Sequence, residues 1–278
     1  MSNNYLINEF STSVGVSYRN QWVNVEDAPT TQLLNFEWIS DERRAIFGGH
    51  IINDQTGKIG QTGIYGNYAY RLNLGKRSDQ SLAIGLSAGV VQYSAQLSQI
   101  QFFDIEEQPL TDDNFVFPDF GMGIFYHYSD KYYAGFSIPQ TFSLETRFEA
   151  TDRTFAFDRI QHLYFVAGGY YQVTWFGNET SFVEPSVWIR YVPDAPLSID
   201  LNARYQISEL VWAGLGLGTA FGVGTGSRVN FEVGVVLGEQ INLTKGQLKL
   251  GMAFDSHVAG EIRDFFGTSF EANAVYSF

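Results

Sequence analysis

The chain has 278 residues, with 30 acidic and 17 basic side chains, no cysteine and a formal net charge of -13. This acidic balance argues against a nucleic-acid partner, because nucleic-acid-binding proteins present a basic surface. The lack of cysteine excludes disulfides, cysteine-ligated zinc and a thiol nucleophile. Aromatic residues make up 16% of the chain and charged residues only 17%, a composition unlike that of a disordered protein.

Hydrophobicity alternates with a period of two residues along most of the chain. In residues 10–22 the even positions are mostly apolar or aromatic, and the odd positions are polar or small. No segment has a helical period of helical length, and no apolar run approaches the roughly 20 residues of a transmembrane helix. The pattern predicts fourteen strands, near residues 10–22, 31–40, 44–53, 63–74, 81–94, 119–129, 131–140, 161–175, 182–192, 196–206, 209–221, 227–238, 247–257 and 267–278.

The connections between these segments alternate in length. Those after even-numbered segments are tight, as around Asp130, whereas 95–118 and 141–160 follow odd-numbered segments and are long. Short turns at one rim and long loops at the other are typical of bacterial outer-membrane barrels. We therefore predict an all-β fold, a single transmembrane antiparallel up-and-down barrel domain over residues 1–278. It is expected to be integral to the outer membrane, with both termini periplasmic and the long loops extracellular.

The composition of the two strand faces distinguishes this barrel from a soluble sandwich or propeller. The polar face carries many glycines, such as Gly85, Gly214 and Gly218, which would fill a soluble core poorly. An apolar face against outer-membrane lipid and a polar, glycine-rich lumen account for both faces. The terminal Phe278 resembles the assembly signal of bacterial outer-membrane proteins. Because no signal peptide is visible at the start, we expect a processed or trimmed chain.

Several short motifs occur in an order and spacing that are more specific than any one of them. They are residues 18–22 (YRNQW), 28–32 (APTTQ), 62–71 (TGIYGNYAYR), 84–93 (IGLSAGVVQY), 118–123 (PDFGMG) and 132–139 (YYAGFSIP). Together they resemble the PorP/SprF family of the Bacteroidota. The resemblance implies a role in type IX secretion and gliding motility, in which the barrel secretes a large adhesin or anchors it through a type B C-terminal domain. It also implies other type IX components, or a lipoprotein, as partners.

Charged residues of both signs fall on the polar face of the predicted strands. Those predicted to line the lumen are Arg19, Arg71, Glu184, Arg190, Asp200, Arg204, Glu232, Lys249, Asp255 and Glu271. Mixed signs favour cross-lumen ion pairs that stiffen the wall over a one-signed ion filter. The same residues could equally contact an inserted polypeptide.

The two long loops differ in composition. Loop 95–118 is acidic and contains no lysine or arginine, while loop 141–160 has both signs and several phenylalanines. Phenylalanine exposed on a loop favours a docking surface, although charged loops also simply keep a surface soluble. The predicted partner-binding residues are Phe142, Phe148, Phe155, Phe157, Asp104, Glu106 and Glu107.

The sequence offers no recognisable catalytic or cofactor site. Its four histidines lack the paired spacing of a metal site, and no Ser/His/Asp set falls at a shared height. Residues 53–57 resemble a loop with a turn-forming glycine, not a calcium loop. We therefore expect a non-enzymatic protein without cofactor or metal. Two interpretations stay open: a secretion or anchoring barrel for a protein cargo, and a passive diffusion channel for small solutes.

Overall fold

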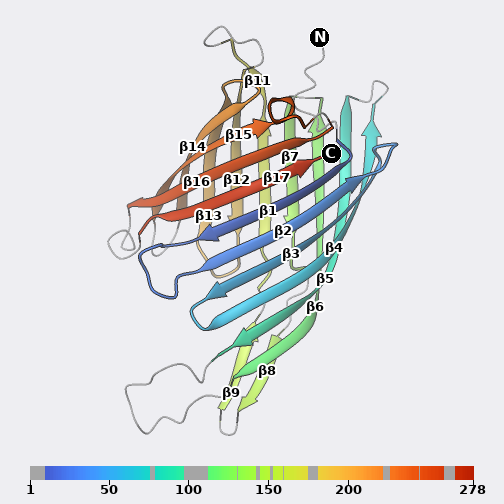
Figure 1. The fold of residues 1–278 in the computed structure, drawn as a ribbon. Helices are drawn as coiled ribbons and strands as arrows, with labels where there is room; N and C mark the ends of the chain where they lie inside the picture. The colour runs from blue at the N-terminus through green and yellow to red at the C-terminus, as the bar shows by residue number, and fades with distance from the viewer. Residues whose placement is uncertain are drawn as a thin grey trace.

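The structure of this chain is a computed structural model that describes residues 10–75, 79–96, 112–129, 131–141, 145–150, 153–158, 160–174, 181–221, 226–243, 245–259 and 267–278. Its strands form one antiparallel sheet that closes on itself as a barrel, with a separate two-stranded hairpin beyond one rim (Figure 1). No helix in these ranges is long and apolar enough to cross a membrane. A short 3-10 turn, η3 (Glu239–Ile241), lies between two strands of the wall.

The wall consists of strands that are neighbours in chain order. The main sheet has 15 strands, of which β10 and β11 are one strand interrupted at Tyr170, so fourteen strands of the described chain form the wall. Their bounds are β1 (Thr12–Asn20), β2 (Thr30–Ile39), β3 (Ala45–Thr56), β4 (Ile59–Leu74), β5 (Gln80–Ala95), β6 (Asp113–Tyr128), β7 (Tyr132–Ile138), β10 (Leu163–Gly169) with β11 (Tyr171–Gln172), β12 (Phe182–Tyr191), β13 (Leu197–Gln206), β14 (Val211–Phe221), β15 (Ser227–Leu237), β16 (Gln247–Ala259) and β17 (Ser269–Ser277). The predicted barrel and its strand number are confirmed.

Two pairings close the barrel. β1 pairs with β17, and Thr12 and Phe278 exchange backbone hydrogen bonds of 3.0 and 2.9 Å. β10 pairs with β7 on one side and with β12 on the other. The start of β1 and the end of β17 therefore lie at one rim, together with the turns after β2, β4 and β6 (Figure 1). We call this the turn rim, and the opposite one the loop rim.

Two predicted boundaries are wrong because the strand ladders continue further than expected. Residues 53–56, predicted as part of a loop, end β3 and pair with residues 59–62 of β4. Gly57 and Lys58 alone make this turn, and Gly57 takes the left-handed φ of 58° that so tight a turn requires. β6 begins at Asp113 instead of near 119, because residues 113–118 pair with residues 90–95 of β5. The acidic loop therefore ends before Asp113.

Two further differences lie outside the wall. Trp22, assigned by alternation to the first strand, follows the end of β1 and has a φ of 57°, so strand parity does not set its direction. Residues 141–160, predicted as one long loop, contain the hairpin β8 (Glu145–Ala150) and β9 (Arg153–Asp158). Figure 1 shows this hairpin beyond the loop rim.

The outer face of the barrel is an extended apolar surface. Cross-strand register places apolar residues side by side from strand to strand, as in the row Leu34, Ile51 and Ile64. Large apolar side chains stay exposed on this face, including Leu86 at 60% and Leu217 at 61%. Soluble monomers rarely expose apolar area of this extent, whereas a barrel in lipid requires it.

One part of the wall extends past this apolar band. β4, β5 and β6 have 16 residues each, whereas about 9–11 residues suffice for a strand to cross a bilayer. Toward the loop rim most outward positions change from apolar residues to polar ones such as Thr62 and Gln92, although Val116 stays apolar and exposed. On the inward face Tyr93 stacks on Phe117, with ring centroids 5.2 Å apart. Residues 59–62, 92–95 and 113–116 thus form what we call the projecting sheet.

Candidate functional site in the barrel lumen

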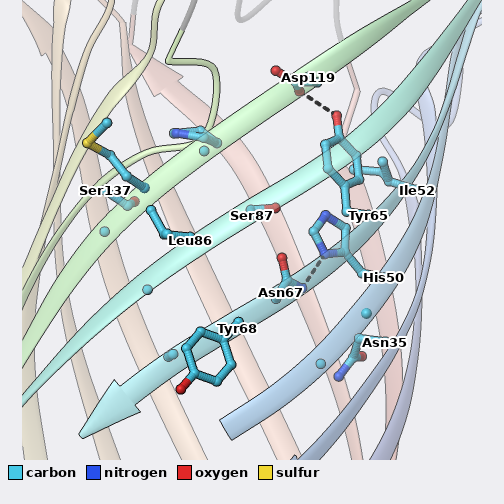
Figure 2. Close-up of a pocket in the computed structure, with 18 of the residues that line it drawn as sticks. Asn35, His50, Ile52, Tyr65, Asn67, Tyr68, Leu86, Ser87, Asp119 and Ser137 are labelled. Atoms are coloured by element: carbon cyan, nitrogen blue, oxygen red, sulfur yellow. Dashed lines mark hydrogen bonds between the residues drawn. The ribbon is translucent and has the colours of Figure 1, made fainter. Parts of the chain in front are cut away.

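The inner wall surrounds three adjoining cavities. The polar cavity, of about 790 Å³, lies along β2–β6 and reaches Tyr164 of β10 (Figure 2). The aromatic recess, of about 480 Å³, is lined chiefly by Phe125, Tyr164, Val166 and Trp188. The charged cavity, of about 500 Å³, lies along β12, β13, β15–β17 and β1, and includes Trp188. Tyr164 and Trp188 therefore connect the recess to the cavities on either side.

Hydroxyl, amide and ring groups hold one another in place in the polar cavity. Figure 2 shows Tyr65 donating a 2.7 Å hydrogen bond to Asp119, whose side chain is almost fully buried. The Phe120 N–H donates to the same carboxylate at 2.9 Å. His50 stacks on Tyr65 with ring centroids 4.5 Å apart, and its Nδ1 lies 3.0 Å from Asn67 Nδ2. The cavity therefore presents fixed donors and acceptors to its interior.

Ion pairs dominate the charged side of the lumen. Arg19 lies 2.5 Å from Asp255 and 3.4 Å from Glu271, so one guanidinium bridges two carboxylates. Arg204 pairs with Glu184, which also accepts a 2.8 Å hydrogen bond from a tyrosine hydroxyl on β7. Each of these groups has a partner of opposite sign. Removing either member of a partly buried pair destabilises the fold, because the other charge is left without a partner.

Among the described residues the lumen ion pairs run along the wall and do not cross the lumen, contrary to the prediction of cross-lumen pairs. Arg204 and Glu184 are register partners on the neighbouring strands β13 and β12. Arg228 of β15 reaches Asp200 of β13 over the strand between them. Because neighbouring strands lie about 4.8 Å apart, a long side chain reaches one or two strands along the wall but not the opposite side.

Glycines on β14 make this reach possible. Arg228 donates to both oxygens of Asp200, at 2.6 and 2.8 Å, directly above Gly218. A Cβ at Gly218 would lie 2.6 Å from Arg228 Nε. Two asparagines meet in the same way above Gly216. The inward glycines of β14 therefore leave no room for a ligand, because the side chains of the wall itself fill the space.

Comparison with known proteins decides the family. The sequence profile described as "Type IX secretion system membrane protein PorP/SprF" matches residues 5–276. The chain belongs to the PorP/SprF family. It is thus a barrel associated with type IX secretion, as the resemblance of its motifs implies. No curated protein matches the chain.

Solved outer-membrane barrels share the fold of this PorP/SprF protein. The CymD monoaromatic hydrocarbon channel matches with a TM-score of 0.58 and 11% identity, over 100% of this chain and 93% of that one. A Pseudomonas aeruginosa FadL homologue matches at 0.55 and 8%, over 96% and 88% of the two chains. The Acinetobacter baumannii outer membrane protein Omp33 matches at 0.52 and 8%, over 98% and 99%. Identities this low show the barrel fold alone. The fold and the family together indicate an integral outer-membrane protein.

The charged residues predicted from the sequence take several positions in this PorP/SprF barrel. Most of them form the ion pairs described above, and Arg190 lies 3.8 Å from Asp200. Glu232 lines the charged cavity. Arg71 and Lys249 take part in none of the ion pairs found among the described residues. That all ten residues line the lumen stays a prediction.

The predicted partner-binding residues divide between described and undescribed parts of the chain. Asp104, Glu106, Glu107 and Phe142 lie outside the described residues. The other three lie on the β8–β9 hairpin, where Phe148 is opposite Phe155 and Phe157 is opposite Thr146. Their role in binding stays a prediction.

Sequence reasoning missed the aromatic recess. Phe125 has the same strand parity as Gly123, and Trp188 has the same parity as Glu184, so both belong to the face predicted to be polar. An aromatic residue at a lumen-facing position was the available signal.

Within the described ranges, no three His, Asp or Glu side chains are close enough to hold a metal ion. The lumen thus offers binding surfaces of three kinds in a continuous arrangement.

Proposed function

We propose that this barrel binds a large secreted protein from the extracellular side, through the loop rim, and that part of this cargo reaches into the lumen. The cargo is an adhesin with a type B C-terminal domain, and the barrel acts in its secretion or surface anchoring and in gliding motility. The loop rim then faces outward and both termini face the periplasm. Family membership is the observation that carries this proposal.

The shape of the loop rim supports a protein ligand. The projecting sheet continues the wall past the apolar band on one side of the barrel. The β8–β9 hairpin lies beyond the same rim (Figure 1). A diffusion channel needs neither feature, since its wall can end where the lipid ends. A raised surface beside the entrance instead gives a partner protein an area to contact.

The lumen supports entry of part of that partner. Its cavities hold about 790, 480 and 500 Å³, and they adjoin one another through Tyr164 and Trp188. Volumes of this size accept several side chains of an inserted segment. The mixed charges along β12–β17 would fix the register of such a segment more than its affinity.

Deletion of residues 143–157 tests the proposal. This change removes the β8–β9 hairpin, and cargo retained at the cell surface should be lost while the barrel still folds. Surface-protein mass spectrometry measures retention, and heat-modifiable migration on a gel reports folding. As a control, Asp41→Ser with Glu42→Ser alters the turn rim and should leave retention unchanged.

The diffusion channel is the alternative outcome of this experiment. Retention that survives the deletion, together with a change confined to solute permeability in liposome swelling, would replace the cargo proposal with the channel.

A further inference from the structure

The aromatic recess is an apolar stretch with charge at both ends. One row of register partners crosses the inner wall in the order Arg71, Ala83, Phe125, Gly135, Val166, Trp188 and Asp200. Its middle is apolar, and Phe125 and Trp188 stay 42% and 50% exposed. Asp200 is held by Arg228 at 2.6 Å, whereas Arg71 belongs to none of the ion pairs among the described residues.

No bulky side chain crowds Gly85, which lines one side of the recess. A Cβ at Gly85 would meet Ala69 Cβ at 3.6 Å and backbone oxygens at 3.8 and 3.9 Å, all ordinary contacts. The neighbouring row therefore leaves the rings of Phe125 and Trp188 facing the cavity. Leaving large apolar rings in contact with water is unfavourable, and a ligand that covers them gains free energy in proportion to the area buried.

We propose that the aromatic recess binds an aromatic side chain of the polypeptide segment that enters the lumen. An acidic residue close to it in the sequence of that segment pairs with Arg71. This inference rests on the proposed function and names the chemistry of the inserted part. The aromatic side chain supplies most of the affinity, as buried aromatic anchors do in protein interfaces, and the Arg71 pair fixes the direction of the chain.

The surroundings of the recess favour a polypeptide over a free aromatic molecule. Asn67 and His50 lie in the polar cavity on one side, and Asn202 and Asn230 line the charged cavity on the other. An extended backbone carries an N–H and a C=O at nearly every residue, and each needs a partner where water is excluded. A hydrocarbon would fill the recess but make no use of the polar groups on either side of it.

Photo-crosslinking tests the occupant directly. Phe125→p-benzoylphenylalanine places a crosslinker in the recess, and Ile124→p-benzoylphenylalanine places the same group on the outer face one residue away, where Ile124 is 51% exposed. After irradiation of intact cells and purification, position 125 should give a polypeptide adduct. Peptide mapping should place it on one segment with an aromatic residue and a nearby acidic residue. The absence of a polypeptide adduct at 125, or the same adducts at 124, overturns the proposal.

Filling the recess separates this inference from the proposed function. Gly85→Leu should lower cargo retention roughly tenfold, because burial of one aromatic side chain is lost, while Ile84→Leu on the outer face of the same strand should leave it unchanged. If deletion of residues 143–157 abolishes retention and Gly85→Leu does not, the recess inference is wrong and the proposed function stands. If neither variant changes retention, both are wrong. If Gly85→Leu only blocks toluene entry into liposomes, the recess is a solute site and this inference is overturned.

Discussion

Among the inward glycines of this barrel, those of β14 and Gly85 of β5 have opposite surroundings. On β14 the space above Gly216 and Gly218 is occupied by side chains from β13 and β15 that bond to each other. On β5 a Cβ at Gly85 would make only ordinary contacts, and the aromatic recess lies beside it. The difference comes from the neighbouring strands, which carry long polar side chains beside β14 and Ala69 beside Gly85.

The comparison teaches that a glycine facing a lumen does not by itself mark a binding site. On β14 the glycines permit two strands to be tied together over a third, which is a structural role. Beside the recess Gly85 carries no side chain that would cover the neighbouring apolar rings, which is a feature that a ligand can use. The two roles can be separated by experiment.

The largest expected effect comes from placing a charge on the wrong face of the ion-paired wall. Leu201 is 56% exposed on the outer face of β13, and Asn202 next to it lines the charged cavity. Leu201→Arg should destabilise the barrel by roughly 2–4 kcal/mol near the bilayer midplane. Asn202→Arg should cost much less, because its charge meets water and carboxylates. Urea unfolding in liposomes measures both, and equal costs would show that the assignment of faces is wrong.

Alanine substitution at Gly218 and at Gly85 compares the two surroundings most directly. Gly218→Ala forces apart Asp200 and Arg228, and breaking a partly buried pair of this kind should cost about 2 kcal/mol. Gly85→Ala meets only ordinary contacts, and should be neutral or slightly stabilising because glycine in a strand is entropically costly. Similar losses of unfolding free energy at the two sites, in the same titration, would show that crowding by neighbouring side chains does not distinguish Gly218 from Gly85.

The smallest expected effect concerns salt. Arg228→Gln removes the charge opposite Asp200, and should cost about 1–2 kcal/mol with a loss that shrinks as ionic strength rises. Tyr65→Phe removes the hydrogen bond to the buried Asp119 and should cost a similar amount. The cost of Tyr65→Phe should change little with salt, because this substitution removes a neutral hydroxyl and no charge. Unfolding at low and high salt measures the contrast, and an equal salt response would contradict it.

The alternation in the sequence predicted the strands and their faces, because each side of the wall meets a different solvent. It could not predict which strands meet at which register. Arg19 and Asp255, which are 236 positions apart, become ion-pair partners only when β1 closes against β17. The start of β6 at Asp113 was missed for a related reason: past the lipid the inward residues of β6 become aromatic while Asn114 faces outward, so the apolar face no longer alternates clearly with a polar one.

The recess was missed because two aromatic residues, Phe125 and Trp188, lie on a face that was judged by its average composition. Neither is unusual in its own strand. They become a site only because β7 and β10, with Gly135 and Val166, bring them to one row of the wall.

The projecting sheet also affects how quickly a partner finds the lumen. A barrel with a level rim captures a molecule only when that molecule arrives directly above the opening. Where residues 59–62, 92–95 and 113–116 stand above the apolar band on one side, a long chain can collide with that surface first. Its remaining diffusion is then confined to a plane beside the entrance, and docking in two stages raises the rate of encounter. For a cargo bound as proposed, shortening these strands would slow association while leaving the lifetime of the complex nearly unchanged.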